Sequence, residues 1–456
     1  MSKILMPSSP IWGHIAPMLV VGEDLQRRGH EVVVLTGRKY EDAVRRHGLG
    51  FVPLPAGVDY DDADLDAWLP GRDRYKGLAA VRYDITGMFA RTIPGQHRAL
   101  TAELESGGYD LVLSEGVFMG ALPTLLTVPR AERVPIISVS ALPVTLTSED
   151  TAPFGPALQP GSGPLARLRN RALNSVLHAG PLKPIQRAVV AALAEVGAPA
   201  PAGNFFDQPY RFDATFLLAA EGIEYPRREL PPTVRFLGPL RQAARRDAVL
   251  PSWWADVTGG RPVVHVTQGT IDNVDLGKLL VPALRALAAE DVLVVAATGG
   301  RPVAEVERAF PEGLPANARV AEFLPYDALL PRTSVVVSNG GFGGVQLSLA
   351  HGVPLVVAGT TEDKPEVAAR VRWAGVGVDL RSGRPKPAAI RAGVRRVLAD
   401  QRYAERARGL QRWMAEQGDP LDAIARTVED LGADPLPAPR PAVPADRDGT
   451  VATLVE

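Results

Sequence analysis

Short apolar runs alternate with longer stretches of helical periodicity along the first part of the chain. The expected strands cover 3–7, 31–35, 110–114 and 134–139, and the expected helices cover 13–28 and 38–47. Strands that alternate with helices at this spacing are typical of a parallel sheet with helices on both faces. The N-terminal half therefore predicts a doubly wound α/β domain, which we expect to span 1–225.

Two stretches of this half, 56–108 and 141–205, lack the regular alternation. Both are rich in helical patterns and interrupted by prolines. We expect them to lie outside the sheet as insertions. We also expect their surface to determine which ligand this chain accepts.

The second half repeats the alternation after a turn-rich, polar segment at 226–251 that predicts an interdomain linker. A second doubly wound domain is expected at 252–415, followed by a helix at 416–431 that packs back on the first domain. The tail, 432–456, is rich in Pro, Ala and small polar residues, and is predicted to be disordered. The strands expected in the second domain are 262–266, 291–297, 319–323, 334–338 and 354–357.

Composition agrees with two domains and excludes several classes of protein. The chain has 456 residues, which is more than the roughly 250–300 at which single cores stop growing. Lys and Arg number 50 against 51 Asp and Glu, so no overall positive charge attracts nucleic acid or an anionic membrane. The absence of cysteine excludes disulfides and thiolate metal sites. No apolar run approaches the roughly 20 residues of a membrane span, and the start lacks a signal-peptide pattern, so we expect a cytoplasmic protein.

The loop after the first strand is the first candidate site, because doubly wound folds bind ligands at the carboxyl ends of their strands. It places Gly13 and His14 at the start of the first expected helix. A helix N-terminus favours the neutral imidazole, which is the form that acts as a general base. The alternative is an ordinary capping or surface histidine.

Two further loops contain glycine at a strand-to-helix turn. One is 268–270, ending in Thr270, and the other is 339–344, Asn-Gly-Gly-Phe-Gly-Gly. Backbone N–H groups at such a turn can approach an anion, and the helix dipole adds about half a positive charge. This arrangement predicts a phosphate site; a tight turn without a ligand is the alternative.

Other phosphate and metal motifs do not fit. Neither 35–37 nor 297–299 supplies the acidic residue that a dinucleotide site needs after its second strand. Lys278 is followed by Leu279 rather than Ser or Thr, which excludes a Walker loop. The acidic run 59–66 lacks the glycine and closing glutamate of an EF-hand.

The order and spacing of these motifs resemble the inverting, metal-independent glycosyltransferases of the GT-B fold. The likeness is to the bacterial natural-product, macrolide-type branch, which is related to the UDP-glycosyltransferases, and it extends to about residue 431. Four segments resemble the donor-binding signature of that family: 323–331, 338–344, 350–354 and 361–366. Gly-His-Ile-Ala-Pro at 13–17 resembles its N-terminal Gly-His-x-x-Pro. The resemblance implies two facing Rossmann-like domains with a cleft between them.

The resemblance also assigns roles to residues. It makes His14 the general base, with Glu115 near the position of the acid that orients it, and it requires no cofactor other than the nucleotide-sugar co-substrate. Trp12, Phe89, Phe118 and Met119 lie near strand ends or in the irregular insertions, and this position makes them the candidates to contact a small, largely apolar acceptor; the alternative for most of them is an ordinary place in the core. The donor, a UDP- or TDP-linked hexose or deoxyhexose, is expected at Gly13, Thr270, Phe323, Pro325, Asn339, Gly340, Gly341, Gly343, Gly344, Asp363 and Lys364.

Three positions depart from the family pattern. Asn339 replaces a phosphate-contacting His, Gly344 replaces a Ser or Thr, and Lys364 replaces a Gln. The alternatives are therefore a GT-B epimerase or hydrolase of sugar nucleotides, and a non-catalytic homologue that activates a partner. The sequence does not indicate the oligomeric state.

Overall fold

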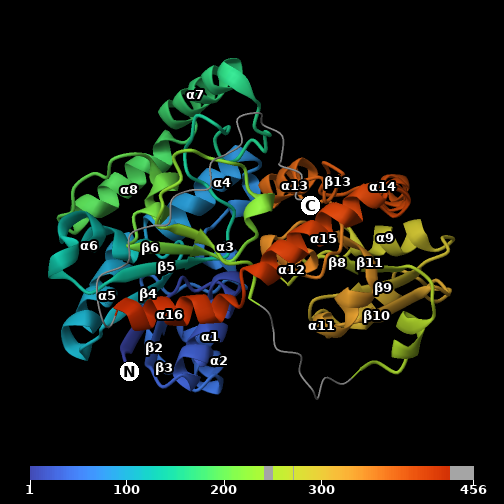
Figure 1. Cartoon of the computed structure of the whole chain (residues 1–456), viewed down its shortest axis with the longest axis horizontal. Helices are drawn as coiled ribbons and strands as arrows, with labels where there is room; N and C mark the ends of the chain where they lie inside the picture. Colours follow the sequence, from blue (N-terminus) through green and yellow to red (C-terminus); the bar gives the residue numbers. More distant parts are fainter. Residues whose placement is uncertain (241–249, 271, 432–456) are drawn as a thin grey trace.

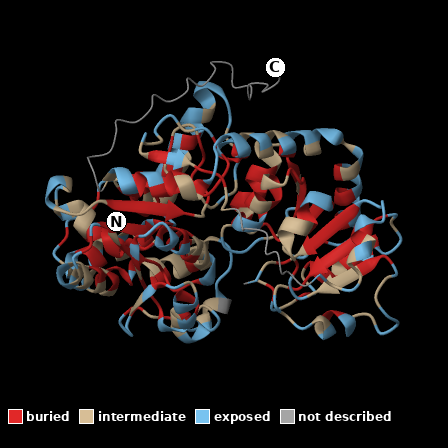
Figure 2. Cartoon of the chain, turned by 60° about the horizontal axis from the view of Figure 1, so that its bottom comes forward, coloured by how far each residue is buried: buried red, intermediate tan, exposed pale blue. Residues whose placement is uncertain are grey.

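The computed structural model describes residues 1–240, 250–270 and 272–431, which form two α/β domains side by side (Figure 1). Each domain contains a parallel sheet whose inner strands are almost entirely buried and whose edge strands are partly exposed (Figure 2). Such strands are continuous apolar runs because helices cover both of their faces. The predicted α/β class with two doubly wound domains is confirmed.

The N-terminal sheet has the order β3-β2-β1-β4-β5-β6-β7. Strand β1 is central: Ile4 pairs with Val32 of β2 on one side and with Leu111 of β4 on the other. The order reverses between β1 and β4, so the loops after these two strands diverge and leave a crevice. The strands are β1 (Lys3–Pro7), β2 (Glu31–Thr36), β3 (Gly50–Pro53), β4 (Leu111–Glu115), β5 (Ile136–Ser140), β6 (Ala214–Leu217) and β7 (Val234–Phe236).

The helices of this domain include those of the two irregular insertions. The first insertion contributes a 3-10 turn at Arg72–Arg74 before α4, and the second contributes α7 and α8. The helices are α1 (Trp12–Arg27), α2 (Glu41–Arg46), α3 (Leu65–Trp68), α4 (Leu78–Ile85), α5 (Ile93–Gly107), α6 (Leu122–Thr127), α7 (Gly163–Ala179) and α8 (Lys183–Glu195).

The C-terminal sheet has the order β10-β9-β8-β11-β12-β13, and its order reverses between β8 and β11. Its strands are β8 (Val263–Thr267), β9 (Leu293–Ala297), β10 (Ala318–Ala321), β11 (Thr333–Ser338), β12 (Leu355–Val357) and β13 (Gly377–Asp379). The helices are α9 (Leu280–Leu287), α10 (Val303–Glu307), α11 (Tyr326–Leu329), α12 (Phe342–Ala350), α13 (Lys364–Trp373), α14 (Pro387–Ala399), α15 (Gln401–Glu416) and α16 (Pro420–Leu431).

The predicted linker boundary at 226 is wrong, because β7 lies inside the segment 226–251 and pairs with β6 in the N-terminal sheet. The Pro-rich composition around this short edge strand concealed it. Residues 241–249 of that linker and the predicted tail, 432–456, lie outside the described residues.

Helix α16 belongs in space to the N-terminal domain (Figure 1). Ile424 and Val428 are fully buried in the core that α1 and the N-terminal sheet share. Arg28 at the end of α1 donates to Asp422 at 2.5 Å. The chain thus crosses from the second domain back to the first.

A buried group of charges also joins the domains. Arg370 of α13 donates to Glu224, which follows β6, and to Glu366 of its own helix, each at 2.9 Å. Glu366 in turn accepts from the backbone amides of Gly155 and Ala157 at 2.7 and 2.8 Å. The segment that follows β5 is therefore held against α13. Within the described part of the chain, no helix is long and apolar enough to span a bilayer.

Candidate active site

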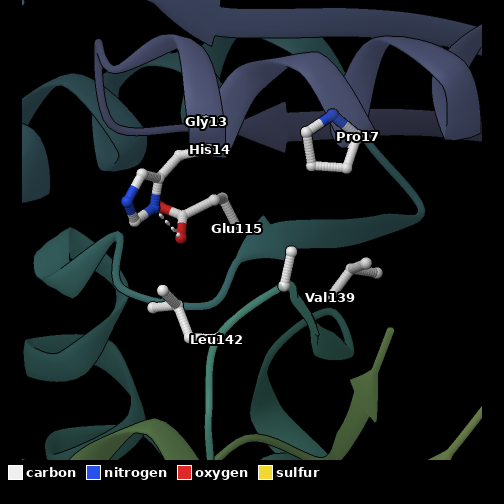
Figure 3. Close-up of a pocket in the computed structure, with 7 residues that line it drawn as sticks. Gly13, His14, Pro17, Glu115, Val139 and Leu142 are labelled. Carbon is white, nitrogen blue, oxygen red and sulfur yellow. Dashed lines mark hydrogen bonds and ion pairs between the residues drawn. The ribbon is translucent and has the colours of Figure 1, made fainter. Parts of the chain in front are cut away.

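His14 and Glu115 meet at the point where the order of the N-terminal sheet reverses. His14 lies in the first turn of α1, directly after β1, and Glu115 is the last residue of β4. Their side chains point toward each other and form a direct hydrogen bond at the wall of a small cavity that Gly13, Pro17, Val139 and Leu142 also line (Figure 3). The topology thus brings together two residues separated by 101 positions.

The pair is buried and its geometry is fixed. Nδ1 of His14 lies 2.8 Å from Oε1 of Glu115, and the side chains are 15% and 4% exposed. The backbone amide of Val117 donates to the same carboxylate oxygen at 2.9 Å. Since an ionised carboxylate only accepts, the imidazole donates from Nδ1, and the lone pair of its neutral form is on Nε2.

Electrostatics raise the pKa of His14 above its usual range. Burial disfavours the imidazolium and by itself would lower this pKa, but the charge and hydrogen bond of Glu115, together with the charges of two further carboxylates, outweigh it. Asp363 and Glu362 add to the rise. Both belong to the loop after β12 in the C-terminal domain, so this loop lies within electrostatic range of His14 on the other domain.

Asp363 is the first residue before α13 and makes no side-chain capping bond. Burial raises the pKa of its carboxyl to about 6, with Glu362 adding to the rise and Lys364 and His14 opposing it. His14 and Asp363, on opposite domains, therefore perturb each other. The Asp363 carboxyl therefore lies within electrostatic range of His14.

A larger cavity, about 420 Å³ in volume, lies at the order reversal of the C-terminal sheet. The loops after β8, β11, β12 and β13 form most of it, at the sheet edge where an open α/β sheet binds its ligand. Its lining contains backbone and side-chain donors and several charges. The lining residues are Lys76, Gln268, Asp272, Lys278, Leu279, Asn339, Ala358, Gly359, Thr360, Thr361, Gly383 and Arg384.

The glycine-rich loop opens α12 beside this cavity. Gly340 has φ +84°, a conformation that residues with a Cβ rarely adopt. No atom lies within 4 Å of the Cβ positions of Gly343 and Gly344, so the space over the helix start is open. The amide of Asn339 instead donates to the carbonyl of Gln268 at 2.5 Å and joins the two loops. The first turn of α12 is thus accessible to an anion.

Phe323 and Pro325 follow β10 at the far side of the same sheet edge. The Phe323 side chain is 68% exposed, and a Cβ at Gly300 would lie 2.9 Å from its ring. The glycine loop after β9 therefore lies under one part of the ring, while most of the ring faces solvent. Such a ring can stack on a planar base. Thr270 is exposed in the loop after β8, and Gly13 is exposed beside His14.

Lys364 is buried, with its side chain 4% exposed and its ammonium paired with Glu362. Glu362 has φ +56°, unusual for a residue with a side chain. The ion pair thus holds the loop between β12 and α13 in shape. Gly341 is the residue that precedes α12. A Cβ placed on Gly340 would be in van der Waals contact with Lys364, so the loop before α12 packs against the loop before α13.

The four residues expected to contact an acceptor fall into two groups. Trp12 is 41% exposed, and the Phe89 ring lies 6.2 Å from that of His14. Phe118 and Met119 are 0% and 1% exposed, and pack into two hydrophobic clusters. Because the connection after β4 turns inward, these two have no surface for a ligand to touch, which corrects the expectation for them.

Sequence reasoning missed most of the charges around the larger cavity. Lys278 donates to Asp272 at 2.6 Å, and Arg384 donates to Asp275 at 2.5 Å. The position of Lys278 in the loop after the central strand β8 was a usable signal, whereas Arg384 follows the edge strand β13. Lys76 reaches the cavity from the other domain, and no local motif in the sequence marks it.

Comparison with known proteins identifies relatives over almost the full chain. Residues 284–431 match the family described as Erythromycin biosynthesis protein CIII-like, C-terminal domain. The chain is 38% identical to 4'-demethylrebeccamycin synthase of Lentzea aerocolonigenes, over 93% of this chain and 98% of that protein. It is 32% identical to UDP-glycosyltransferase 2 of Phaeomoniella chlamydospora, over 94% of this chain and 96% of that protein.

A solved structure shows the same fold. The glycosyltransferase SsfS6 of Streptomyces sp. SF2575, complexed with thymidine diphosphate, superposes with a TM-score of 0.62 at 21% identity. The match covers 94% of this chain and all of that one. Both domains are therefore shared.

Proposed function

The chain belongs to the natural-product glycosyltransferases of the GT-B fold, and we propose that His14 is the general base of its transfer reaction. The donor is a UDP- or TDP-linked hexose or deoxyhexose, and the acceptor is a small, largely apolar natural product. The reaction inverts the anomeric carbon and proceeds without a metal ion. The single observation that carries this proposal is the buried His14–Glu115 pair at the mouth of the cleft.

The pair supports proton abstraction. Glu115 fixes the ring through Nδ1, so Nε2 is the atom that takes the proton of the attacking acceptor group. The same carboxylate stabilises the imidazolium that forms. A base held on one domain and a donor held on the other suit attack from the face opposite the leaving group, which is the geometry of inversion.

The leaving group is a nucleoside diphosphate, and its growing charge needs donors rather than a second acid. The open first turn of α12 supplies backbone N–H groups and the positive end of its helix dipole beside the cavity, where Lys278 and Arg384 are each already paired with an aspartate. The helix start supports departure of the diphosphate without a metal ion. Glycoside hydrolysis, by contrast, requires a pair of carboxyl groups.

The acceptor side is apolar around the base. Phe89 lies beside His14, and packs on a cluster formed by Ile11, Tyr60, Leu69 and Met88. Exposed Trp12 lies at the same helix end. The relative named 4'-demethylrebeccamycin synthase supports a natural product as the acceptor class.

The proposal is tested by incubating the protein with UDP- and TDP-sugars and a pool of hydroxylated aromatic and macrolide aglycones. Mass spectrometry should detect an aglycone enlarged by one sugar, with the opposite anomeric configuration by NMR. Free sugar or an altered sugar nucleotide in the absence of any aglycone product would instead support a hydrolase or an epimerase. A protein that binds none of the sugar nucleotides would indicate a non-catalytic homologue.

A further inference from the structure

Lys76 is the one lining residue of the 420 Å³ cavity that the N-terminal domain contributes, within the described residues. It follows the 3-10 turn Arg72–Arg74 and precedes α4, so it belongs to the first insertion. Every other described lining residue lies on the C-terminal domain. Lys76 therefore approaches the cavity from across the cleft.

The other cations of the cavity are already compensated. Lys278 is paired with Asp272, which also accepts from Thr361 at 2.9 Å. Arg384 is paired with Asp275. Lys76 is exposed and forms no hydrogen bond or ion pair with any side chain that the structure describes. It is thus the positive charge at this cavity that remains available for an anionic ligand.

The loop that carries Lys76 is anchored and lies close to the opposite domain. Arg72 makes a two-pronged contact with Asp84 of α4, at 2.7 and 2.9 Å. Asp84 and, across the cleft, Glu362 both raise the pKa of Arg72. The backbone around Lys76 is therefore fixed next to the loop after β12, while its own side chain is free to reach into the cavity.

We propose that Lys76 binds the diphosphate of the sugar donor from the N-terminal domain and so links donor binding to closure of the cleft. The inference rests on the proposed function, because it takes the donor to occupy the C-terminal cavity. A lysine ammonium suits this role, since it is a compact charge on a long, flexible stem. Its contact joins the two domains through the ligand.

Closure by this contact has a chemical consequence. An ammonium brought against the phosphates adds positive charge where the leaving group develops its own negative charge. Drawing the insertion over the donor also excludes water and favours transfer over hydrolysis. Lys76 is a donor-binding residue in this account and takes no part in the proton transfer at His14.

The test is a binding titration of the wild-type protein and of Lys76→Ala, Lys76→Arg and Arg74→Ala with UDP, TDP, uridine and thymidine. Arg74 is the matched control, because it is an exposed cation in the same loop that does not line the cavity. Loss of one charged hydrogen bond predicts about tenfold weaker binding of the preferred diphosphate by Lys76→Ala. Binding of the nucleoside should not change, Lys76→Arg should retain most of the affinity, and Arg74→Ala should match the wild type.

Steady-state kinetics provide the second readout. For Lys76→Ala, KM for the donor should rise about tenfold, and the ratio of free sugar to transferred sugar should increase. Unchanged diphosphate binding by Lys76→Ala would overturn the inference, as would an equal loss of diphosphate and nucleoside binding. If the wild-type protein binds neither UDP nor TDP, the proposed function itself fails, and this inference with it.

Discussion

Nδ1 of His14 lies 2.8 Å from Oε1 of Glu115, and this contact connects the first helix of the chain to the end of strand β4. His14 follows β1 and Glu115 ends β4, and the strand order of the N-terminal sheet reverses between these two strands. The equivalent reversal of the C-terminal sheet carries the larger cavity. The fold therefore places the His14–Glu115 pair and the larger cavity at matching positions of two facing domains.

Replacing Glu115 with Gln should change the pH profile of transfer. Since Glu115 raises the pKa of His14, the wild-type protein should lose activity as the pH falls through a value above about 6.5, when the base becomes protonated. In Glu115→Gln the acid limb should move to lower pH. Burial still lowers the pKa of His14, but only Asp363 and Glu362 then remain to raise it. The maximal rate should fall about 10- to 100-fold.

The measurement is kcat/KM from pH 5 to 9, with Glu105→Gln, an exposed residue of α5, as the control. An acid limb that stays at the wild-type pH in Glu115→Gln would show that the carboxylate does not act through His14.

Donor binding should weaken below pH 6. Burial raises the pKa of Asp363 to about 6, so its carboxylate, which accepts hydrogen bonds from sugar hydroxyls in this account, becomes protonated there. Asp363→Asn should therefore show a donor KM that is high at every pH and no longer rises in acid. The measurement is donor KM against pH for both proteins. A parallel pH dependence in the two would contradict the role given to Asp363.

Phe323→Ala should weaken nucleotide binding without affecting folding. The ring is 68% exposed, so its removal leaves no cavity in the core. Stacking of a base on an aromatic ring contributes about 1 to 3 kcal/mol, which corresponds to roughly 5- to 150-fold in affinity. Calorimetry with UDP and TDP checks this, and thermal melting serves as the folding control. Wild-type affinity in the variant would place the base elsewhere.

Arg370→Met should destabilise the protein strongly. Removing the guanidinium leaves Glu224 and Glu366 buried without their partner, which typically costs about 3 to 5 kcal/mol of unfolding free energy. Urea denaturation measures the loss. Arg372→Met, on the same helix but half-buried and only loosely paired, should cost less than about 1 kcal/mol. Equal midpoints for the two variants would mean that the charges between the domains do not stabilise the fold.

The fold was predictable because parallel strands and their helices leave a regular pattern. The short strands β3, β6, β7 and β13 escaped notice, since strands of three or four residues carry little periodicity. The candidate base was predictable because a strand, a loop and a helix place His14 locally. Its approach to Glu115 depends on which strands pair, and here the resemblance to a family supplied the partner.

Contacts between the domains were beyond local reasoning. Lys76 lies nearly two hundred residues before the loops whose cavity it lines, and nothing in its own surroundings marks it. Phe118 and Met119 were predicted as ligand contacts but are buried. Their position after β4 suggested a ligand contact, but the direction in which each side chain points is decided by packing against α5 and α8.

The most direct test of the account is the transfer rate of His14→Ala at saturating donor. The account predicts a fall of about 10²- to 10⁴-fold in kcat, with the affinity for UDP or TDP unchanged, because the base acts on the acceptor and the donor is held by the other domain. A variant that retains near wild-type transfer while binding donor normally would contradict the assignment of His14 as the base.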